Sequence, residues 1–191
     1  MDSLYQTLHE DGLPLKLVGI VVGLALIASH LFALIRPGAV QPWLVKFPRN
    51  EKLGIALVVI GFVWTLFVWT NMDLGEFFKA ERIVQLLLVA GCIGVIVYVK
   101  EFLAVRALGF LMILAAAPIL EAAFLKDPTS RLLLVLFAYV IALKGMFWVG
   151  MPYLLRDQIK WVLAESYRYR IGAIAGLVYG VAIAGCAILW W

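Results

Sequence analysis

The sequence predicts an all-α, polytopic integral membrane protein: a single compact bundle of six transmembrane helices with mostly short loops, occupying residues 1–191. Composition is the first reason. The chain is 65% hydrophobic and 15% charged, with a mean hydropathy of +1.02. A soluble domain is about 45–50% apolar, and a soluble fold of this size could not bury so much more apolar surface away from water. The pattern is the second reason. Its apolar runs are continuous rather than alternating, which favours helices and excludes a membrane β-barrel.

Length gives the third reason. A bilayer core of about 30 Å requires about 20 apolar residues at 1.5 Å per residue. Six segments reach or approach that length. The predicted spans are 13–35, 53–70, 83–99, 102–125, 132–155 and 171–191.

The first span follows an acidic N-terminal stretch, which is unlike the basic start of a signal peptide, so we expect this span to be retained. The boundary between the third and fourth spans is the least defined, because only Lys100 and Glu101 separate them. A tight turn there gives six spans, with Arg106 extending towards the membrane surface from the start of the next helix. One long helix that breaks near Lys100 would give five.

Lys and Arg residues set the expected orientation. Five lie on the side of the N-terminus, and ten lie on the other side. Because cytoplasmic loops carry the excess of positive charge, the second side is predicted to be cytoplasmic and both termini to be outside. We expect the membrane to be a bacterial inner (plasma) membrane. The ten residues are Arg36, Lys46, Arg49, Lys52, Lys100, Arg106, Arg156, Lys160, Arg168 and Arg170.

Two predicted cytoplasmic loops have structure of their own. Loop 36–52 contains three prolines, so it is not expected to be helical throughout. Loop 155–170 mixes basic and aromatic residues at a spacing that predicts an amphipathic helix in the headgroup region. Its basic side could meet anionic lipid headgroups, or its charge could only set topology. The headgroup candidates are Arg156, Lys160, Trp161, Arg168 and Arg170.

Glycines repeat every four residues on two predicted helices. The last span carries Gly172, Gly176 and Gly180, and the first carries Gly19 and Gly23. Residues four apart share a helix face, and glycine allows another backbone to approach closely. We interpret both rows as packing faces that join helices within the chain or between subunits.

Lys144 is a lone cation within the fifth predicted span, 13 residues after Arg131 and 12 before Arg156. A central lysine is disfavoured by about 2.5–3.5 kcal/mol on insertion scales, so it needs a partner, a polar cavity or a carbonyl cluster. It could hold an anionic ligand, or it could pair with another helix or subunit. Glu121 is the obvious partner within the chain, but a direct pair would require helix tilt or a bend at Pro118.

Few other groups suggest chemistry. His30 shares a face with Gly23, which predicts an interior, hydrogen-bonded histidine rather than a ligand. His9 lies on the opposite side of the membrane, so bis-histidine haem binding is not expected, and no cluster has metal-ligand spacing. No metal or other cofactor is predicted. The two cysteines lie in apolar segments and suggest packing residues.

Common catalytic motifs are missing from the sequence, and its basic residues form no continuous stripe, so a nucleic-acid partner is not expected. Three functions remain. The favoured one is a non-catalytic subunit or scaffold of a larger membrane assembly, with other membrane subunits or further copies of the chain as partners besides the bilayer. The first alternative is a small homo-oligomeric transporter or channel that uses Lys144. The second is a lipid- or quinone-modifying enzyme.

Overall fold

A computed structural model describes residues 13–72, 81–99 and 101–191. Within these residues the chain is helical and forms no strand, as predicted. Five helices are long and apolar enough to cross a membrane: α2 (Leu15–Ile35), α4 (Glu51–Asn71), α6 (Leu103–Ala123), α7 (Leu132–Gly150) and α9 (Ser166–Leu189). A sixth apolar helix, α5 (Glu81–Tyr98), is shorter.

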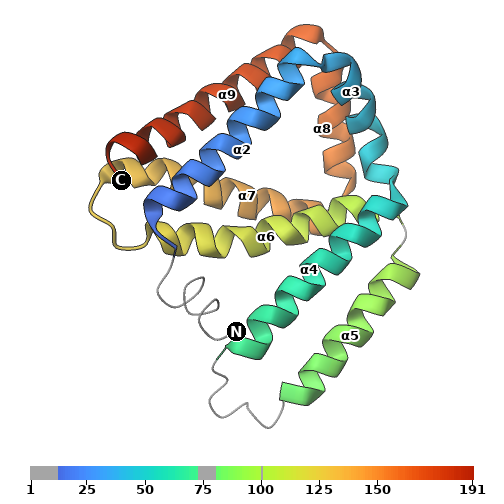
Figure 1. Cartoon of the computed structure of the whole chain (residues 1–191). Helices are drawn as coiled ribbons and strands as arrows, with labels where there is room; N and C mark the ends of the chain where they lie inside the picture. The colour runs from blue at the N-terminus through green and yellow to red at the C-terminus, as the bar shows by residue number, and fades with distance from the viewer. Residues whose placement is uncertain (1–12, 73–80, 100) are drawn as a thin grey trace.

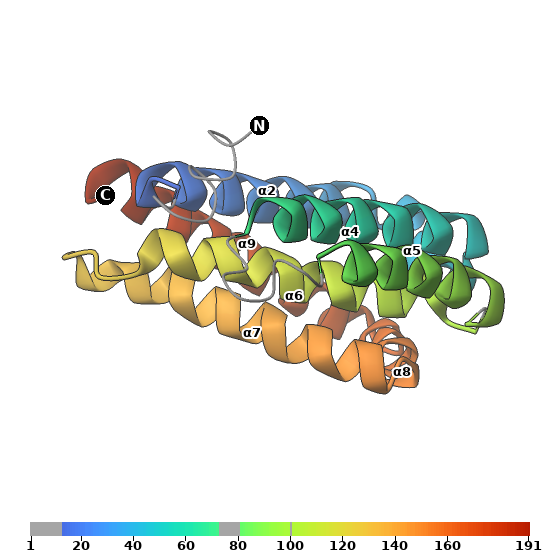
Figure 2. The ribbon, with the colours of Figure 1, turned by 90° about the horizontal axis from the view of Figure 1, so that it is seen from below.

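Two arms of packed helices form a V (Figure 1). One arm is the pair α2 and α9, and the other is the hairpin of α6 and α7, with α4 against α6 and α5 against α4. Seen from below, the long helices run along the longest dimension of the molecule (Figure 2). Two shorter helices, α3 (Pro37–Lys46) and α8 (Tyr153–Leu163), contact each other across the wide end of the V.

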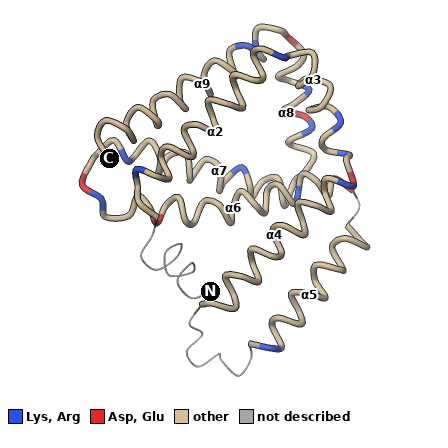
Figure 3. Tube along the Cα trace, in the orientation of Figure 1, with Lys and Arg blue, Asp and Glu red and all other residues tan. Residues whose placement is uncertain are grey.

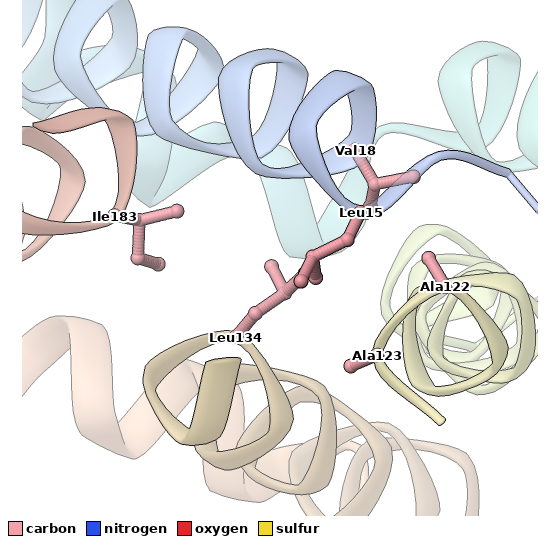
Figure 4. Packing of buried hydrophobic residues seen from close by; sticks show 6 residues of the cluster. All are labelled: Leu15, Val18, Ala122, Ala123, Leu134 and Ile183. Atoms are coloured by element: carbon pink, nitrogen blue, oxygen red, sulfur yellow. The ribbon is translucent and has the colours of Figure 1, made fainter. Parts of the chain in front are cut away.

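The two arms meet around a small apolar core at the narrow end. Side chains from α2, α6, α7 and α9 converge there (Figure 4). A second core lies where the chain after α3 meets α6, around Phe47, Ala104 and Val105. The first core therefore lies at the narrow end of the V, and the second lies at its wide end. The residues in Figure 4 are Leu15, Val18, Ala122, Ala123, Leu134 and Ile183.

Charged residues gather at the helix ends and connections (Figure 3). We call the end that carries α3 and α8 the basic end, since most of the described Lys and Arg residues lie there. These are Arg36, Lys46, Arg49, Lys52, Arg106, Arg156, Lys160, Arg168 and Arg170. The excess of Lys and Arg at this end thus agrees with the unequal distribution of these residues between the two sides of the predicted spans.

The boundary between the third and fourth spans is a reversal of the chain. Helix α5 ends at Tyr98, α6 begins at Leu103, and the two run in opposite directions (Figure 1). Phe102, with a φ of 55°, makes the turn. Lys100 lies outside the described residues. Two separate helices therefore stand where the alternative expected one long helix with a break, and five helices, with α5 shorter, have the length and hydropathy of a membrane span.

Loop 36–52 is not helical throughout, as predicted, since Arg36 and Asn50 lie outside the helices, whereas the helix predicted in loop 155–170 is shorter than expected. Loop 36–52 is mostly helical, because α3 continues through Pro42 before the short 3-10 helix Phe47–Arg49. Pro42 removes the bond that would go to the carbonyl of Gly38, an exposed residue whose carbonyl water can bind. The amphipathic helix predicted over 155–170 is the shorter α8, and Arg168 and Arg170 belong to α9.

Candidate functional site

Lys144 lies closer to a helix end than the sequence predicts. The predicted span 132–155 is too long, since α7 ends at Gly150 and Pro152 precedes α8. Lys144 is six residues before that end, about 9 Å along the axis. Its side chain is exposed, and no described residue forms an ion pair or hydrogen bond with it. It is therefore a cation within a helix that is apolar enough to span a membrane, without a described partner in its own chain.

Glu121 does not meet Lys144. Gly145, the neighbour of Lys144, packs against Gly109 and Ile113 of α6. Glu121 lies 12 residues beyond Gly109, about 18 Å along the helix axis. For the two charges to pair, a bend at Pro118 would have to bring Glu121 closer to Lys144 by most of that distance. Glu121 is half-buried near the end of α6, and it has no described ion-pair partner.

The exposed cation shares a helix face with two apolar side chains. Val140 and Phe147 are four residues before and three residues after Lys144, and both are exposed. We call Val140, Lys144 and Phe147 the Lys144 face. Gly145, which points towards α6, is buried. One side of α7 is thus used for packing within the chain, and the Lys144 face is left open.

Most of the predicted glycines pack within the chain. A Cβ on Gly23 would lie 2.8 Å from the backbone nitrogen of Ala184, and one on Gly180 would lie 3.0 Å from the backbone nitrogen of Ile27. Gly19 meets Ala187 and the ring of Trp191. These contacts let α2 and α9 approach closely. Gly172 is the exception, with nothing within 4 Å of its Cβ position.

His30 belongs to the same helix pair. Its Nδ1 lies 2.8 Å from the carbonyl oxygen of Leu26. Because a carbonyl only accepts, Nδ1 carries the proton in this bond. The other edge of the ring packs on Gly176, where a methyl group would overlap it. The side chain also borders a 700 Å³ apolar cavity where α2, α3, α8 and α9 meet, beside Trp43 and Tyr169.

The basic residues of α8 and early α9 are largely engaged with their neighbours. Arg156 pairs with Asp157 at 2.9 Å, and its guanidinium lies 5.9 Å from the ring centre of Phe102. Arg168 stacks at 4.8 Å from the ring centre of Trp161. Lys160 and Arg170 are exposed, and so is most of Trp161. This layer can meet headgroups, but it gathers no cluster that resembles a catalytic centre.

Sequence reasoning missed three side chains that close helix ends. The Nη1 of Arg106 donates to the carbonyl of Val149 at 2.7 Å, and the Nη1 of Arg131 donates to that of Ala123 at 3.0 Å. The hydroxyl of Tyr169 donates to the carbonyl of Ala33 at 2.8 Å. All three carbonyls lie in the last turn of a helix, where intrahelical donors run out. The sequence could show that these side chains lie near predicted helix ends. It could not show which carbonyl each one binds, because that depends on tertiary packing.

No group of three metal-ligating side chains occurs among the described residues. The chain matches no known family model, and no curated protein or solved structure is significantly similar to it. The Lys144 face is therefore the strongest candidate site, because it combines a membrane-depth charge with exposure.

Proposed function

We propose that the protein is a non-catalytic membrane subunit that docks, through its Lys144 face, against a transmembrane helix of a different protein. The observation that carries this proposal is the exposed Lys144 on an otherwise apolar helix, without a described partner in its own chain. A charge at this depth is costly unless it is paired. A carboxylate on a neighbouring helix would lower that cost.

Among the residues that the structure describes, a second copy of the chain offers no carboxylate that matches Lys144 in depth. Copies related by an axis along the membrane normal keep equivalent residues at the same depth. The described acidic residues lie near the two ends of the molecule, at positions 51, 101, 157 and 165 on the basic side and 81, 121 and 127 on the other. None is at the depth of Lys144, which favours a heteromeric partner over a homo-oligomer.

The transporter and enzyme alternatives have weaker support. A transporter that uses Lys144 requires a polar path to it, but the exposed side chain lines none of the larger described cavities. A lipid- or quinone-modifying enzyme requires several polar groups around one reacting point. In the described part of the chain, His30 and Lys144 lie on different arms of the V.

We propose the orientation that the loop charges favour: α3 and α8 at the cytoplasmic face and the C-terminus outside, in a bacterial plasma membrane. The concentration of Lys and Arg around these two helices supports the assignment, because positive loops are retained in the cytoplasm.

Site-specific photo-crosslinking in living cells tests the docking surface. A photoreactive amino acid at Phe147 samples the Lys144 face, and the same amino acid at Met146 samples another exposed side of α7. We expect a defined adduct from position 147 that disappears when Lys144→Met is added, and none of that mass from position 146. Equal adducts from both positions, or an adduct that survives Lys144→Met, would contradict the proposal.

A further inference from the structure

An open apolar groove runs between α4, α5 and α6. Its volume is 430 Å³, and its walls include Val58 of α4, Gly91 and Val95 of α5, and Phe110 of α6. None of the α5 side chains described from 82 to 98 is fully buried, so this helix stands away from its neighbours. The groove is therefore a gap in the packing of the bundle.

One cation lines the groove. Arg106 lies three residues into α6, at the basic end of the molecule. Its Nη1 binds the carbonyl of Val149, while its buried Nε has no partner among the described residues. No described carboxylate forms an ion pair with it. Since a guanidinium has five N–H donors, most of its hydrogen-bonding capacity is unused within the described chain, and no described carboxylate balances its charge.

The dimensions of the groove match one leaflet of a bilayer. The groove follows α5 from Leu87 to Val95, about 12 Å along the helix, and extends to Val99, which directly follows the helix. Half of a hydrocarbon core is about 15 Å. A chain that enters beside Arg106 would thus reach close to the bilayer centre, and the guanidinium would stay near the headgroups.

We propose that this groove binds an anionic phospholipid of the leaflet at the basic end, with an acyl chain between α4, α5 and α6 and its phosphate at Arg106. The apolar walls suit the acyl chain. The unmatched guanidinium suits a phosphate, which it binds with charge-assisted hydrogen bonds. The site is independent of the Lys144 face, which lies on α7.

Gly91 provides a selective way to close the groove. A Cβ at Gly91 would meet nothing within 4 Å, so a leucine side chain has room and would occupy the acyl-chain path. Gly94 is the matched control. It lies on the same helix with equally open surroundings, but it does not line the groove.

The test is native mass spectrometry of delipidated protein titrated with dioleoyl phosphatidylglycerol or dioleoyl phosphatidylcholine. We expect one phosphatidylglycerol to bind the wild type at least about tenfold more tightly than phosphatidylcholine. Gly91→Leu should weaken that binding about tenfold, and Gly94→Leu should leave it unchanged. Arg106→Gln should remove the preference for the anionic lipid.

Several results would overturn the site. Equal binding by the Gly91→Leu and Gly94→Leu proteins would place the lipid elsewhere, and equal retention of both lipids by the wild type would remove the role of Arg106. Retention of oleate but not phosphatidylglycerol would make the occupant a fatty acid. A dimer that Gly91→Leu disrupts would make it a protein helix. Arg106→Gln could also loosen the end of α7, so the two glycine variants decide the question if it fails to fold.

Discussion

Tyr169 replaces a hydrogen bond that Pro37 cannot make. In a continuous helix the carbonyl of Ala33 would accept from the nitrogen of residue 37, but proline has no N–H there. The hydroxyl of Tyr169 donates to that carbonyl instead, at 2.8 Å. An orphaned carbonyl is costly in a membrane. This one bond therefore ties the start of α9 to the end of α2, where the chain turns into α3.

Gly23 has no space for a side chain, in contrast to Gly172. Its Cβ position lies 2.8 Å from backbone nitrogen and 3.0 Å from Cα of Ala184, atoms that no rotamer change can move. We expect Gly23→Leu to force α2 and α9 apart and to lower the unfolding free energy by about 1–3 kcal/mol. Thermal unfolding in mild detergent, followed by circular dichroism, would measure the loss.

Gly172→Leu is the control for that experiment, because nothing lies within 4 Å of the Cβ position of Gly172. The melting temperature of this variant should stay close to that of the wild type. If both variants lose the same stability, or if Gly23→Leu loses none, the glycine contact between α2 and α9 is not what holds this arm together.

At the scale of the elements, α6 and α7 close each other's ends. Arg106 lies near the start of α6 and binds the last turn of α7. Arg131 directly precedes α7 and binds the last turn of α6. A cation at a helix C-terminus also offsets the negative end of the helix dipole, by about 0.3–1 kcal/mol at exposed sites. The closest approach of the two helices is at Gly109 and Gly145, each of whose Cβ positions would lie within 2.7 Å of the other's carbonyl oxygen.

The sequence predicted the existence and order of the membrane helices well, because apolar length alone identifies them. Their ends were less predictable. Helix α7 is shorter than its apolar run, since residues 153–155 begin α8 instead. Helix α9 begins at Ser166, before the predicted residue 171, because its polar first turns continue the same helix.

The candidate site was predicted only in part. Lys144 stood out by its charge, but its exposure and its distance from Glu121 depend on which side of α7 meets α6. That side is set by Gly109 and Gly145, and neither glycine forms a four-residue repeat that would mark it in the sequence. Arg106 was predicted to extend to the membrane surface, but its bond to Val149 and its place in the groove depend on tertiary packing and were not predicted.

At the scale of the whole molecule, the proposed orientation predicts which residues face the cytoplasm. Val45 of α3 and Leu125 after α6 are both strongly exposed, at opposite ends. In a background of Cys92→Ala and Cys186→Ala, we expect Leu125→Cys in intact cells to react with a membrane-impermeant maleimide. We expect Val45→Cys to react only after permeabilisation. If Val45→Cys reacted in intact cells and Leu125→Cys reacted only after permeabilisation, the proposed orientation would be wrong.

The shape of the molecule also bears on its role. Its two arms meet at a narrow apolar core and separate towards the basic end, where α3 and α8 join them (Figure 1). Such a V leaves several helix faces open to the bilayer. The Lys144 face is the one among them, in the described part of the chain, that carries a charge within a long membrane helix and away from its ends.

The most direct test of the proposed docking role is native mass spectrometry of the protein extracted gently from its own membranes. We expect the wild type to carry one defined membrane protein in constant ratio, Lys144→Met to lose it, and Lys16→Met, which removes an exposed charge at the start of α2, to retain it. Finding only monomers or a homo-oligomer for the wild type, or an unchanged complex for Lys144→Met, would contradict the proposal that Lys144 pairs with a different protein.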